Sequence, residues 1–318
     1  MSNILLTGST GFLGTALIPK LLAKGDRVLA LARNPEKAKA ILPAEVEIIE
    51  GDITKPGLGV KKAPNIEQVW HLAAVVQLSQ RDKEETFKVN LMGTKNTIEF
   101  CRDHNISKLV YVGTAYADKR RNPYEESKFQ AEGLVLHSGL QTVVFKPSII
   151  VGKGSSFGTL GTVVTILARV HRRAELLRRE IEIALRLPLL EPTLRIDGQP
   201  AAHLNLIPVG QVASSIARLA DGSNGAIWLT NPRPPTVANV FAWIGEILLI
   251  RLIAREDFSH SLTEEVVASS MSAFLPYFRG EDENMPSSIL PFRTGKAFIQ
   301  RLVRCILSDK LKSMRSSQ

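Results

Sequence analysis

The sequence predicts an α/β protein with a doubly wound parallel sheet, followed by a smaller and mainly helical C-terminal lobe. Three observations support this class. Short apolar runs alternate with helical patterns through the first half of the chain, a glycine-rich turn follows the first run, and the alternation stops after Gly152. Runs that are apolar on both faces and separated by helices are typical of parallel strands covered on both sides. With 318 residues and 44% hydrophobic content, the chain can bury such a core.

The predicted strands share short, apolar and largely β-branched sequences. They are residues 4–7, 28–31, 46–50, 68–72, 108–112 and 142–146. Between the first two, Leu13, Leu17 and Leu21 recur at helical spacing, which predicts a helix over residues 13–23. This order of strand, helix and strand is the βαβ unit on which parallel sheets are built.

The turn after the first strand reads TGSTGFLG and places Gly8, Gly11 and Gly14 three residues apart. Glycines at a strand-to-helix turn let the backbone approach a pyrophosphate, which then lies on the N–H groups at the start of the helix. Glycines also serve tight turns for purely steric reasons. The position between a strand and a helix favours a dinucleotide-binding Rossmann unit over residues 1–152. The contacts expected from this turn are Gly8, Thr10, Gly11, Phe12, Leu13 and Gly14.

The end of the second strand indicates which dinucleotide is bound. A free ribose 2′-hydroxyl is usually held by an acidic residue at this place, whereas a 2′-phosphate calls for arginine. Here the strand ends in LALARN, so Arg33 favours NADP over NAD, unless Arg33 is an ordinary solvated side chain. After the third strand, Asp52 and Ile53 are expected near the adenine, although an aspartate that opens a turn is also an ordinary capping residue.

The segment NPYEESKFQAEG predicts a helix with Tyr124 and Lys128 on one face. A nearby ammonium lowers the pKa of a tyrosine from its usual value of ~10, which makes the phenol a usable acid and base. Thr114 ends the strand KLVYVGT, at the sheet edge where ligands bind. We expect Tyr124 to protonate a carbonyl oxygen that receives hydride from nicotinamide, with Thr114 bonded to that oxygen and Lys128 near the ribose. The alternative is a surface tyrosine beside a solvated lysine.

Residues 1–152 resemble the extended short-chain dehydrogenases/reductases in a series of segments. These are TGSTGFLG, HLAA (71–74), VNLMGT (89–94), YVGTAY (111–116), YEESK (124–128) and KPSIIVG (146–152). The resemblance implies Thr114, Tyr124 and Lys128 as the catalytic set, with Asn90 steadying the active-site helix or a water near Lys128. It also implies that further residues border the cofactor, namely Leu72, Ala73, Ala74, Pro147, Ile149 and Ile150.

The branch within that family is inferred from segments outside this shared set. The acidic pair of the sugar-nucleotide dehydratases is missing after Thr114, and the arginine-bearing segment of the epimerases is missing from residues 204–216. Instead HLAAVVQLS, GTAY, LIPV and IWLTNPRPPT resemble the thioester reductases and fatty acyl reductases, which reduce acyl groups carried on pantetheine. The resemblance implies an NADPH-dependent reductase that acts on acyl-CoA or on an acyl carrier protein.

Two alternatives stay open. Thr114 and Tyr124 lie unusually close in the sequence, and Gly113 stands where serine is common, so a reductase or dehydrogenase of a small apolar ketone or alcohol, of the dihydroflavonol or hydroxysteroid type, is also compatible. A non-catalytic dinucleotide-binding sensor is the third hypothesis. The presence of both Tyr124 and Lys128 favours an enzyme over a sensor.

The substrate lobe is expected over residues 153–203 and 231–318, with a return to the Rossmann unit near 204–230. A glycine- and serine-rich loop (153–161) should precede a helix over residues 163–187. That helix either faces the core in the ordinary way or supplies a basic rim for carrier phosphates through its arginines. These are Arg169, Arg172, Arg173, Arg178 and Arg179.

Apolar runs of the lobe are expected to line a hydrocarbon-binding cavity. They are residues 185–194 and 273–278. The basic amphipathic segment 296–315 should cap the lobe, with contact to an acidic lipid surface as the alternative.

Composition restricts partners and location. The net charge of +9 suits a phosphate-rich cofactor or carrier, and the motifs give no reason to expect a nucleic acid. Cys101 and Cys305 lie far apart, and His71 has no ligand at metal-binding spacing, so we expect neither a disulfide nor a metal. The N-terminal residues lack the features of a signal peptide. We expect a cytoplasmic protein with a small-molecule substrate, for which a homodimer is compatible.

Overall fold

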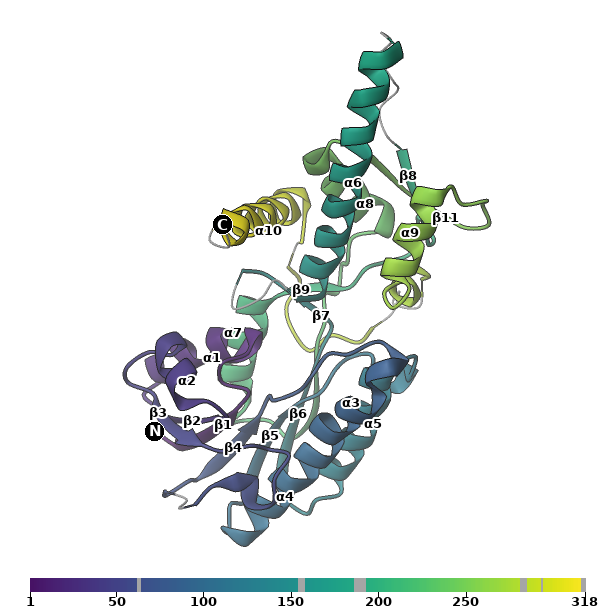
Figure 1. The fold of residues 1–318 in the computed structure, drawn as a ribbon. Coiled ribbons are helices and arrows are strands. Elements are labelled where there is room, and N and C mark those ends of the chain that lie inside the picture. Colours follow the sequence, from purple (N-terminus) through teal and green to yellow (C-terminus); the bar gives the residue numbers. More distant parts are fainter. Residues whose placement is uncertain (62–63, 154–157, 186–192, 281–284, 293, 316–318) are drawn as a thin grey trace.

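The computed structural model describes residues 1–61, 64–153, 158–185, 193–280, 285–292 and 294–315. Its strands and helices form a sheet unit and a lobe (Figure 1), and residues of both units line one cleft at the carboxyl ends of the strands.

A seven-stranded sheet with the order β10-β6-β5-β4-β1-β2-β3 forms the centre of the first unit, and all its strands are parallel. The strands are β1 (Asn3–Thr7), β2 (Arg27–Ala32), β3 (Glu47–Glu50), β4 (Gln68–His71), β5 (Lys108–Val112), β6 (Gln141–Pro147) and β10 (Gly225–Leu229). The predicted strands match observed ones to within one residue at either end. The order reverses between β1 and β4, so a crevice opens there at the carboxyl ends of the strands.

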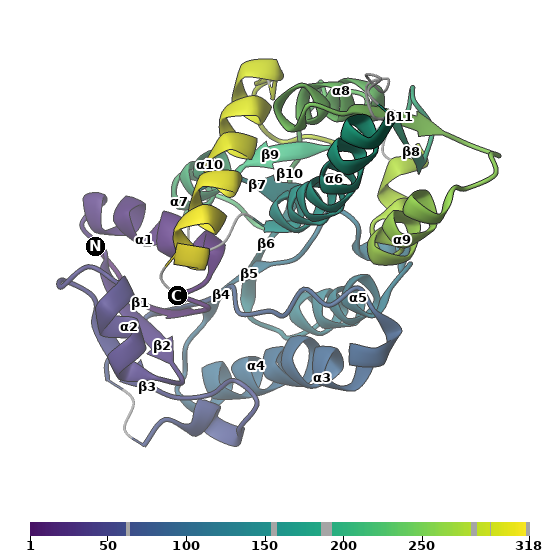
Figure 2. The same cartoon turned by 45° about the horizontal axis from the view of Figure 1, so that its top comes forward.

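Helices cover both faces of the sheet, as a doubly wound fold requires (Figure 2). One face is covered by α1 (Phe12–Ala23), α2 (Pro35–Ile41) and α7 (Val209–Leu219), and the other by α4 (Gly93–Asp103) and α5 (Pro123–Leu136). Neighbouring residues of β1 illustrate the two layers, because Leu6 packs in the core with Leu17 of α1, whereas Leu5 packs in the core with Phe100 of α4. The predicted fold class is therefore confirmed.

The chain leaves the sheet unit after β6 and later returns to it. At the junction, β7 (Ile149–Val151) pairs in parallel with β9 (Leu206–Pro208). The chain then forms α7, which packs against α1, and β10, which pairs with β6. Two separate stretches of sequence thus build one sheet.

The lobe has its own hydrophobic core, distinct from the two cores that flank the sheet. Its elements are α6 (Gly158–Leu185), β8 (Thr193–Asp197), α8 (Val237–Leu248), β11 (Arg251–Arg255), α9 (Leu262–Met271), the 3-10 turn η5 (Leu275–Phe278) and α10 (Lys296–Arg315). The lobe is mainly helical, as predicted, although β8 and β11 form a two-stranded parallel ladder that the sequence pattern did not predict.

The start of α6 corrects one expectation. We expected a loop over residues 153–161, but the helix begins at Gly158. Leu160, Val163 and Leu167 are all buried in the lobe core at helical spacing. Their packing outweighs the low helix propensity of the glycines nearby, which costs only about 1 kcal/mol each.

The C-terminal helix α10 packs its apolar face into the lobe. Ile299, Val303 and Ile306 are buried there, and α10 contacts α8 and α6. The apolar face that we considered for a lipid surface is therefore covered by protein. Within the described part of the chain, none of the helices combines the length and the hydropathy that a membrane span needs.

Candidate active site

A groove of about 280 Å³ runs along the carboxyl ends of β1, β2 and β4. It is lined by residues that the sequence predicted for the cofactor: Gly8, Thr10, Gly11, Phe12, Leu13, Gly14, Arg33, Asp52, Ile53, Leu72, Ala73 and Ala74. Residues that we did not predict also line it: Thr7, Leu31, Ala32, Gly51, Thr54, Val75 and Val89. Except for Val89, the missed residues lie within two positions of the predicted ones in the sequence, so the groove is wider than the motifs alone indicate.

The glycine turn fits a pyrophosphate because it leaves no room for side chains. Gly8 has φ +70°, and a Cβ there would lie 2.7 Å from the backbone nitrogen of Ala73. A Cβ on Gly14 would collide with the backbone oxygen of Gly8. Gly11 precedes α1 without a side-chain cap, so the first N–H groups of the helix stay available to an anion. These residues fit a dinucleotide.

Arg33 and Asp52 lie on the part of the groove expected to hold the adenosine. Arg33 is exposed at the end of β2. Asp52 accepts hydrogen bonds from the backbone nitrogen and the hydroxyl of Thr54, each at 2.9 Å. Partial burial raises the pKa of Asp52, but these hydrogen bonds and the charge of Arg33 outweigh it and lower the pKa below its usual value. Asp52 is thus an ionised turn residue that also lines the groove.

The helix α5 places Tyr124 and Lys128. Asn122 caps the helix by accepting a hydrogen bond from the backbone nitrogen of Glu125 at 2.9 Å, and Pro123 occupies the first turn. These signals fix the start of the helix one residue before Tyr124. Tyr124 and Lys128 therefore reach the same cleft from successive turns.

Tyr124 is hydrogen-bonded to Thr114 but differs from our expectation in its acidity. Burial raises the pKa of Tyr124 to about 12, even though the hydrogen bond from Thr114 lowers it. Glu125 raises it further. We expected Lys128 to lower this pKa below its usual value, and that expectation is wrong, because burial has the larger effect.

The Lys128 side chain is 2% exposed and points toward the end of β5. Its Nζ donates to the backbone oxygen of Val112 at 2.6 Å and lies 4.2 Å from the centroid of the Tyr111 ring. Burial lowers the pKa of Lys128 to about 7, although the charge of Glu132 raises it. Glu132, one turn further along α5, is itself paired with buried Lys146 at 2.8 Å. The lysine is therefore poised between its charged and neutral forms near neutral pH.

Asn90 does not line the cleft, but its hydrogen bonds connect two segments that border it. It lies in a π-helical turn, η3 (Lys88–Met92). Its amide accepts from the backbone nitrogen of Val75 at 2.9 Å and donates to the backbone oxygen of Val75 at 3.0 Å. It also donates to the hydroxyl of Ser127 at 3.0 Å. Since Ser127 bonds to the backbone oxygen of Tyr124, Asn90 connects the loop after β4 to the turn that carries Tyr124.

His71 lies inside the sheet unit, between two threonines. Its Nδ1 is 2.7 Å from the hydroxyl of Thr7, and its Nε2 is 3.1 Å from the hydroxyl of Thr94. Burial lowers the pKa of His71 to about 3, and the charge of Lys128 adds to this. His71 is therefore neutral, and it does not line the groove. Among the described residues, no cluster of histidine, cysteine and carboxylate side chains could hold a metal.

A cleft of about 650 Å³ lies beside the groove, between the sheet unit and the lobe. The predicted Thr114, Tyr124, Lys128, Pro147, Ile149 and Ile150 line it. The lobe contributes Thr162, Ala273, Phe274 and Tyr277. The apolar run 273–278 thus reaches the cleft as expected, whereas much of the run 185–194 lies outside the described residues. Tyr116 also lines the cleft and was not predicted.

A buried polar cluster joins the N-terminus of α5 to the lobe. The guanidinium of Arg121 binds Glu125 through Nη2 at 2.8 Å and stacks 4.4 Å from the Tyr277 ring centroid. The Tyr277 hydroxyl donates to Glu125 at 2.7 Å and accepts from Asn122 at 3.2 Å. No sequence pattern linked Tyr277 to α5.

Among the described side chains of α6, no arginine lines either cavity. Arg169 and Arg172 are exposed and line neither the groove nor the cleft. The side chains of Arg173, Arg178 and Arg179 lie outside the described part. Thr162 is the residue through which α6 reaches the cleft.

Comparison with known families agrees with this geometry. The model of the NAD dependent epimerase/dehydratase family matches residues 4–185, which is more than half of the chain. The chain therefore belongs to that family. The family binds NAD(P), and its fold is the one described above.

Individual relatives are more distant. A 3 beta-hydroxysteroid dehydrogenase/Delta 5-->4-isomerase from Mycobacterium tuberculosis is 27% identical over 183 residues, 48% of this chain and 48% of that protein. A 2-alkyl-3-oxoalkanoate reductase from Shewanella oneidensis is 25% identical over 272 residues, 77% of this chain and 65% of that protein. The matches span about half the length of the first curated relatives.

Among solved structures, the thiolation-reductase di-domain of an archaeal non-ribosomal peptide synthetase aligns with a TM-score of 0.73 at 17% identity. The alignment covers 98% of this chain and 76% of that one. At this identity the likeness concerns the fold, including the lobe.

Proposed function

We propose that the protein is an NADPH-dependent reductase of a carbonyl or acyl thioester group with an apolar tail. The observation that carries the proposal is the meeting of Thr114, Tyr124 and Lys128 at one cleft, directly beside the glycine-lined groove. A carbonyl carbon in this cleft would lie between a hydride source on one side and a phenolic proton donor on the other.

Each side chain has a role that follows from its surroundings. When bound, the cofactor supplies the hydride. Tyr124, with its pKa raised to about 12, is protonated at neutral pH and donates its proton to the carbonyl oxygen. Thr114, already bonded to Tyr124, orients that oxygen. Lys128, which lines the same cleft, would hold the ribose hydroxyls of the cofactor, and Asn90 holds the turn that carries Tyr124 in place.

NADP is the preferred cofactor in this proposal because of Arg33. It is an exposed guanidinium at the end of β2 that lines the groove where the adenosine ribose is expected. A guanidinium binds a phosphate through charge-assisted hydrogen bonds. NAD, which lacks the 2′-phosphate, would forgo these bonds.

The substrate class is inferred from the walls of the cleft. Its surface is largely apolar, and it includes Ile149, Phe274 and Tyr277 from the junction and the lobe. Each buried methylene of a substrate contributes ~0.8 kcal/mol. A relative named 2-alkyl-3-oxoalkanoate reductase and a structural neighbour with a thiolation-reductase di-domain are consistent with an acyl substrate, either free, on CoA or on a carrier protein.

A second candidate is a reductase or dehydrogenase of a small apolar ketone or alcohol. The hydroxysteroid dehydrogenase among the relatives favours it. Both candidates use Thr114, Tyr124 and Lys128 in the same roles. In parallel assays with NADPH, reduction of acyl-CoA thioesters or long-chain aldehydes supports the first candidate, and reduction of small ketones or hydroxysteroids alone supports the second.

The test of the mechanism is the substitution Tyr124→Phe. We expect turnover to fall by at least about 100-fold, since the proton donor is lost, and the NADPH dissociation constant to stay nearly unchanged. Stopped assays of product and a fluorescence titration of NADPH measure the two quantities. Undiminished turnover in the variant would rule out the proposed role of Tyr124.

A further inference from the structure

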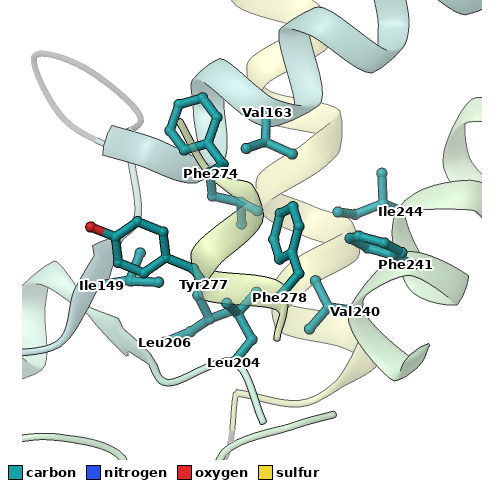
Figure 3. A pocket seen from close by; sticks show the side chains of 11 residues that line it. Ile149, Val163, Leu204, Leu206, Val240, Phe241, Ile244, Phe274, Tyr277 and Phe278 are labelled. Atoms are coloured by element: carbon teal, nitrogen blue, oxygen red, sulfur yellow. The ribbon is translucent and has the colours of Figure 1, made fainter. Parts of the chain in front are cut away.

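A second, smaller pocket lies inside the lobe next to the substrate cleft (Figure 3). Ile149, Phe274 and Tyr277 line both spaces, so the two share a wall. Side chains from α8 lie on the side opposite Ile149 and Tyr277, among them Phe241 and Ile244 (Figure 3). The pocket therefore begins at the cleft that holds Tyr124 and ends in the hydrophobic core of the lobe.

The pocket offers only hydrocarbon and aromatic surface. Tyr277 is the one lining residue with a polar side chain, and Figure 3 shows its hydroxyl pointing away from the other side chains of the pocket. That hydroxyl donates to Glu125 outside the pocket. A water molecule inside would find no hydrogen-bonding partner among these side chains, so the space suits an alkyl group.

The volume of the pocket shows that it is too small for a hydrocarbon tail in this structure. It measures about 20 Å³, against about 650 Å³ for the cleft. A space of about 10–15 Å³ on this measure holds one water-sized group. A hydrocarbon tail can therefore enter only if a side chain of the shared wall moves.

Phe274 is the side chain that can move. Tyr277 is buried and fixed by its hydrogen bonds to Glu125 and Asn122. Phe274, in contrast, is half-buried and has no polar group to anchor its ring. It lies between α9 and η5, where a change of its side-chain rotamer would open the shared wall.

We propose that this pocket is the subsite for the distal hydrocarbon tail of the substrate, and that Phe274 closes it. The side chain at position 274 then sets how long a tail the enzyme accepts. The proposal rests on the proposed function, because it assumes that the reactive carbonyl lies beside Tyr124. It adds the place of the tail and the residue that limits its length.

The experiment uses a homologous series of straight-chain aldehydes with NADPH and two opposite substitutions. Phe274→Ala should open the pocket and move the optimum of kcat/KM to longer chains, with a gain of about fourfold for each further methylene that becomes buried. Ile244→Phe should fill the far end and move the optimum to shorter chains. Phe258→Ala, in the loop after β11 and outside the pocket, is the matched control and should leave the profile unchanged.

A binding measurement separates this inference from the proposed function. Displacement of a fluorescent fatty acid by unlabelled fatty alcohols reports tail binding without turnover. If no carbonyl compound or thioester is reduced but the chain-length dependence of displacement follows residue 274, the subsite stands and the proposed reductase falls. If reduction occurs but neither rate nor displacement depends on chain length or on residue 274, the subsite falls. An NADPH affinity equal to that of the unmodified protein verifies that each variant is folded.

Discussion

Tyr124 and Lys128 have pKa values displaced in opposite directions by the same cause. Burial disfavours the charged form of each, so it raises the pKa of the phenol to about 12 and lowers that of the ammonium to about 7. The Tyr124 phenol is thereby kept protonated. Burial of the Lys128 ammonium, in contrast, lowers the stability of the folded protein. Sites where burial displaces several pKa values are often functional.

The buried ammonium predicts how stability depends on pH. Lys128 has a folded pKa of about 7 and an unfolded pKa of about 10.4, so its cost is fully present below about pH 7 and disappears as the pH rises toward about 10.4. Lys128→Met removes the charge. We expect the free energy of unfolding of Lys128→Met, relative to the unmodified protein, to be largest near pH 6 and to fall by up to about 1.4 kcal/mol per pH unit above 7. Urea unfolding at several pH values measures it, and a difference that does not vary with pH would refute the lowered pKa.

Arg33 predicts the cofactor preference. Replacing Arg33 with Asp puts a carboxylate where the 2′-phosphate is expected. We expect NADPH to bind about 10- to 100-fold more weakly and NADH to become the better ligand, because charge-assisted hydrogen bonds contribute about 1.5–3 kcal/mol. Fluorescence titration measures both affinities, with Arg172→Asp on α6 as the control for net charge. If the unmodified protein binds NADH as well as NADPH, Arg33 does not hold a phosphate.

At the residue scale, the sequence predicted which residues line the groove and the cleft better than it predicted their pKa values. Gly8 and Gly14 could be inferred because glycines three residues apart, between an apolar run and a helical pattern, are visible in the sequence itself. The pair Tyr124 and Lys128 could be inferred because helical spacing puts them on one face. The pKa values of Tyr124 and Lys128 could not be inferred. They depend on how deeply the two side chains are buried, and groups such as Tyr111 that bury them are brought together only by the fold.

At the scale of elements, side-chain contacts join the N-terminus of α5 to the turn η5. Arg121, Glu125 and Asn122 from the first surround Tyr277 from the second, although 152 residues separate Glu125 from Tyr277. This cluster fixes the wall of the cleft against the helix that carries Tyr124. It therefore joins the wall of the proposed substrate cleft to the helix that carries Tyr124, the proposed proton donor.

Substitution of Tyr277 tests the strength of that connection. Tyr277→Phe removes the hydroxyl and leaves a buried carboxylate oxygen of Glu125 without this donor. We expect the free energy of unfolding to fall by about 1–3 kcal/mol. A double-mutant cycle with Glu125→Gln, measured by urea unfolding, should give a coupling energy of at least about 0.5 kcal/mol. Strictly additive effects would show that the two side chains do not support each other.

The strands were predictable because each is a short apolar run between turn signals, as in KLVYV (108–112). The ladder of β8 and β11 was not, because Thr193 and Arg251 pair across 58 residues and each strand alternates exposed and buried positions with little local signal. The start of α6 at Gly158 could not be predicted either, because it also depends on packing between distant segments. Its glycines suggest a loop, and only the lobe core explains a helix there.

At the scale of the whole molecule, the order of the chain interlocks the two units. The chain builds six strands of the sheet, crosses to the lobe through β7, returns through β9 to add α7 and β10, and then crosses again to complete the lobe. The sheet unit therefore cannot be completed until part of the lobe has been traversed. The pairing of β7 with β9 and the contacts of Tyr277 add bonds between the units.

This interlocking predicts that the units unfold together, although chains of this size often unfold in steps. Trp70 in β4 is buried in the sheet unit, and Trp243 in α8 packs against the lobe core, so each reports on one unit. In variants that keep only one of these tryptophans, with phenylalanine at the other positions, we expect the fluorescence midpoint in urea to coincide with that of circular dichroism. Each variant serves as its own reference, since both signals come from the same sample. A Trp243 transition at lower urea than that of the circular dichroism would mean that the lobe opens on its own, and the cleft would then lose its lobe wall before the dinucleotide groove unfolds.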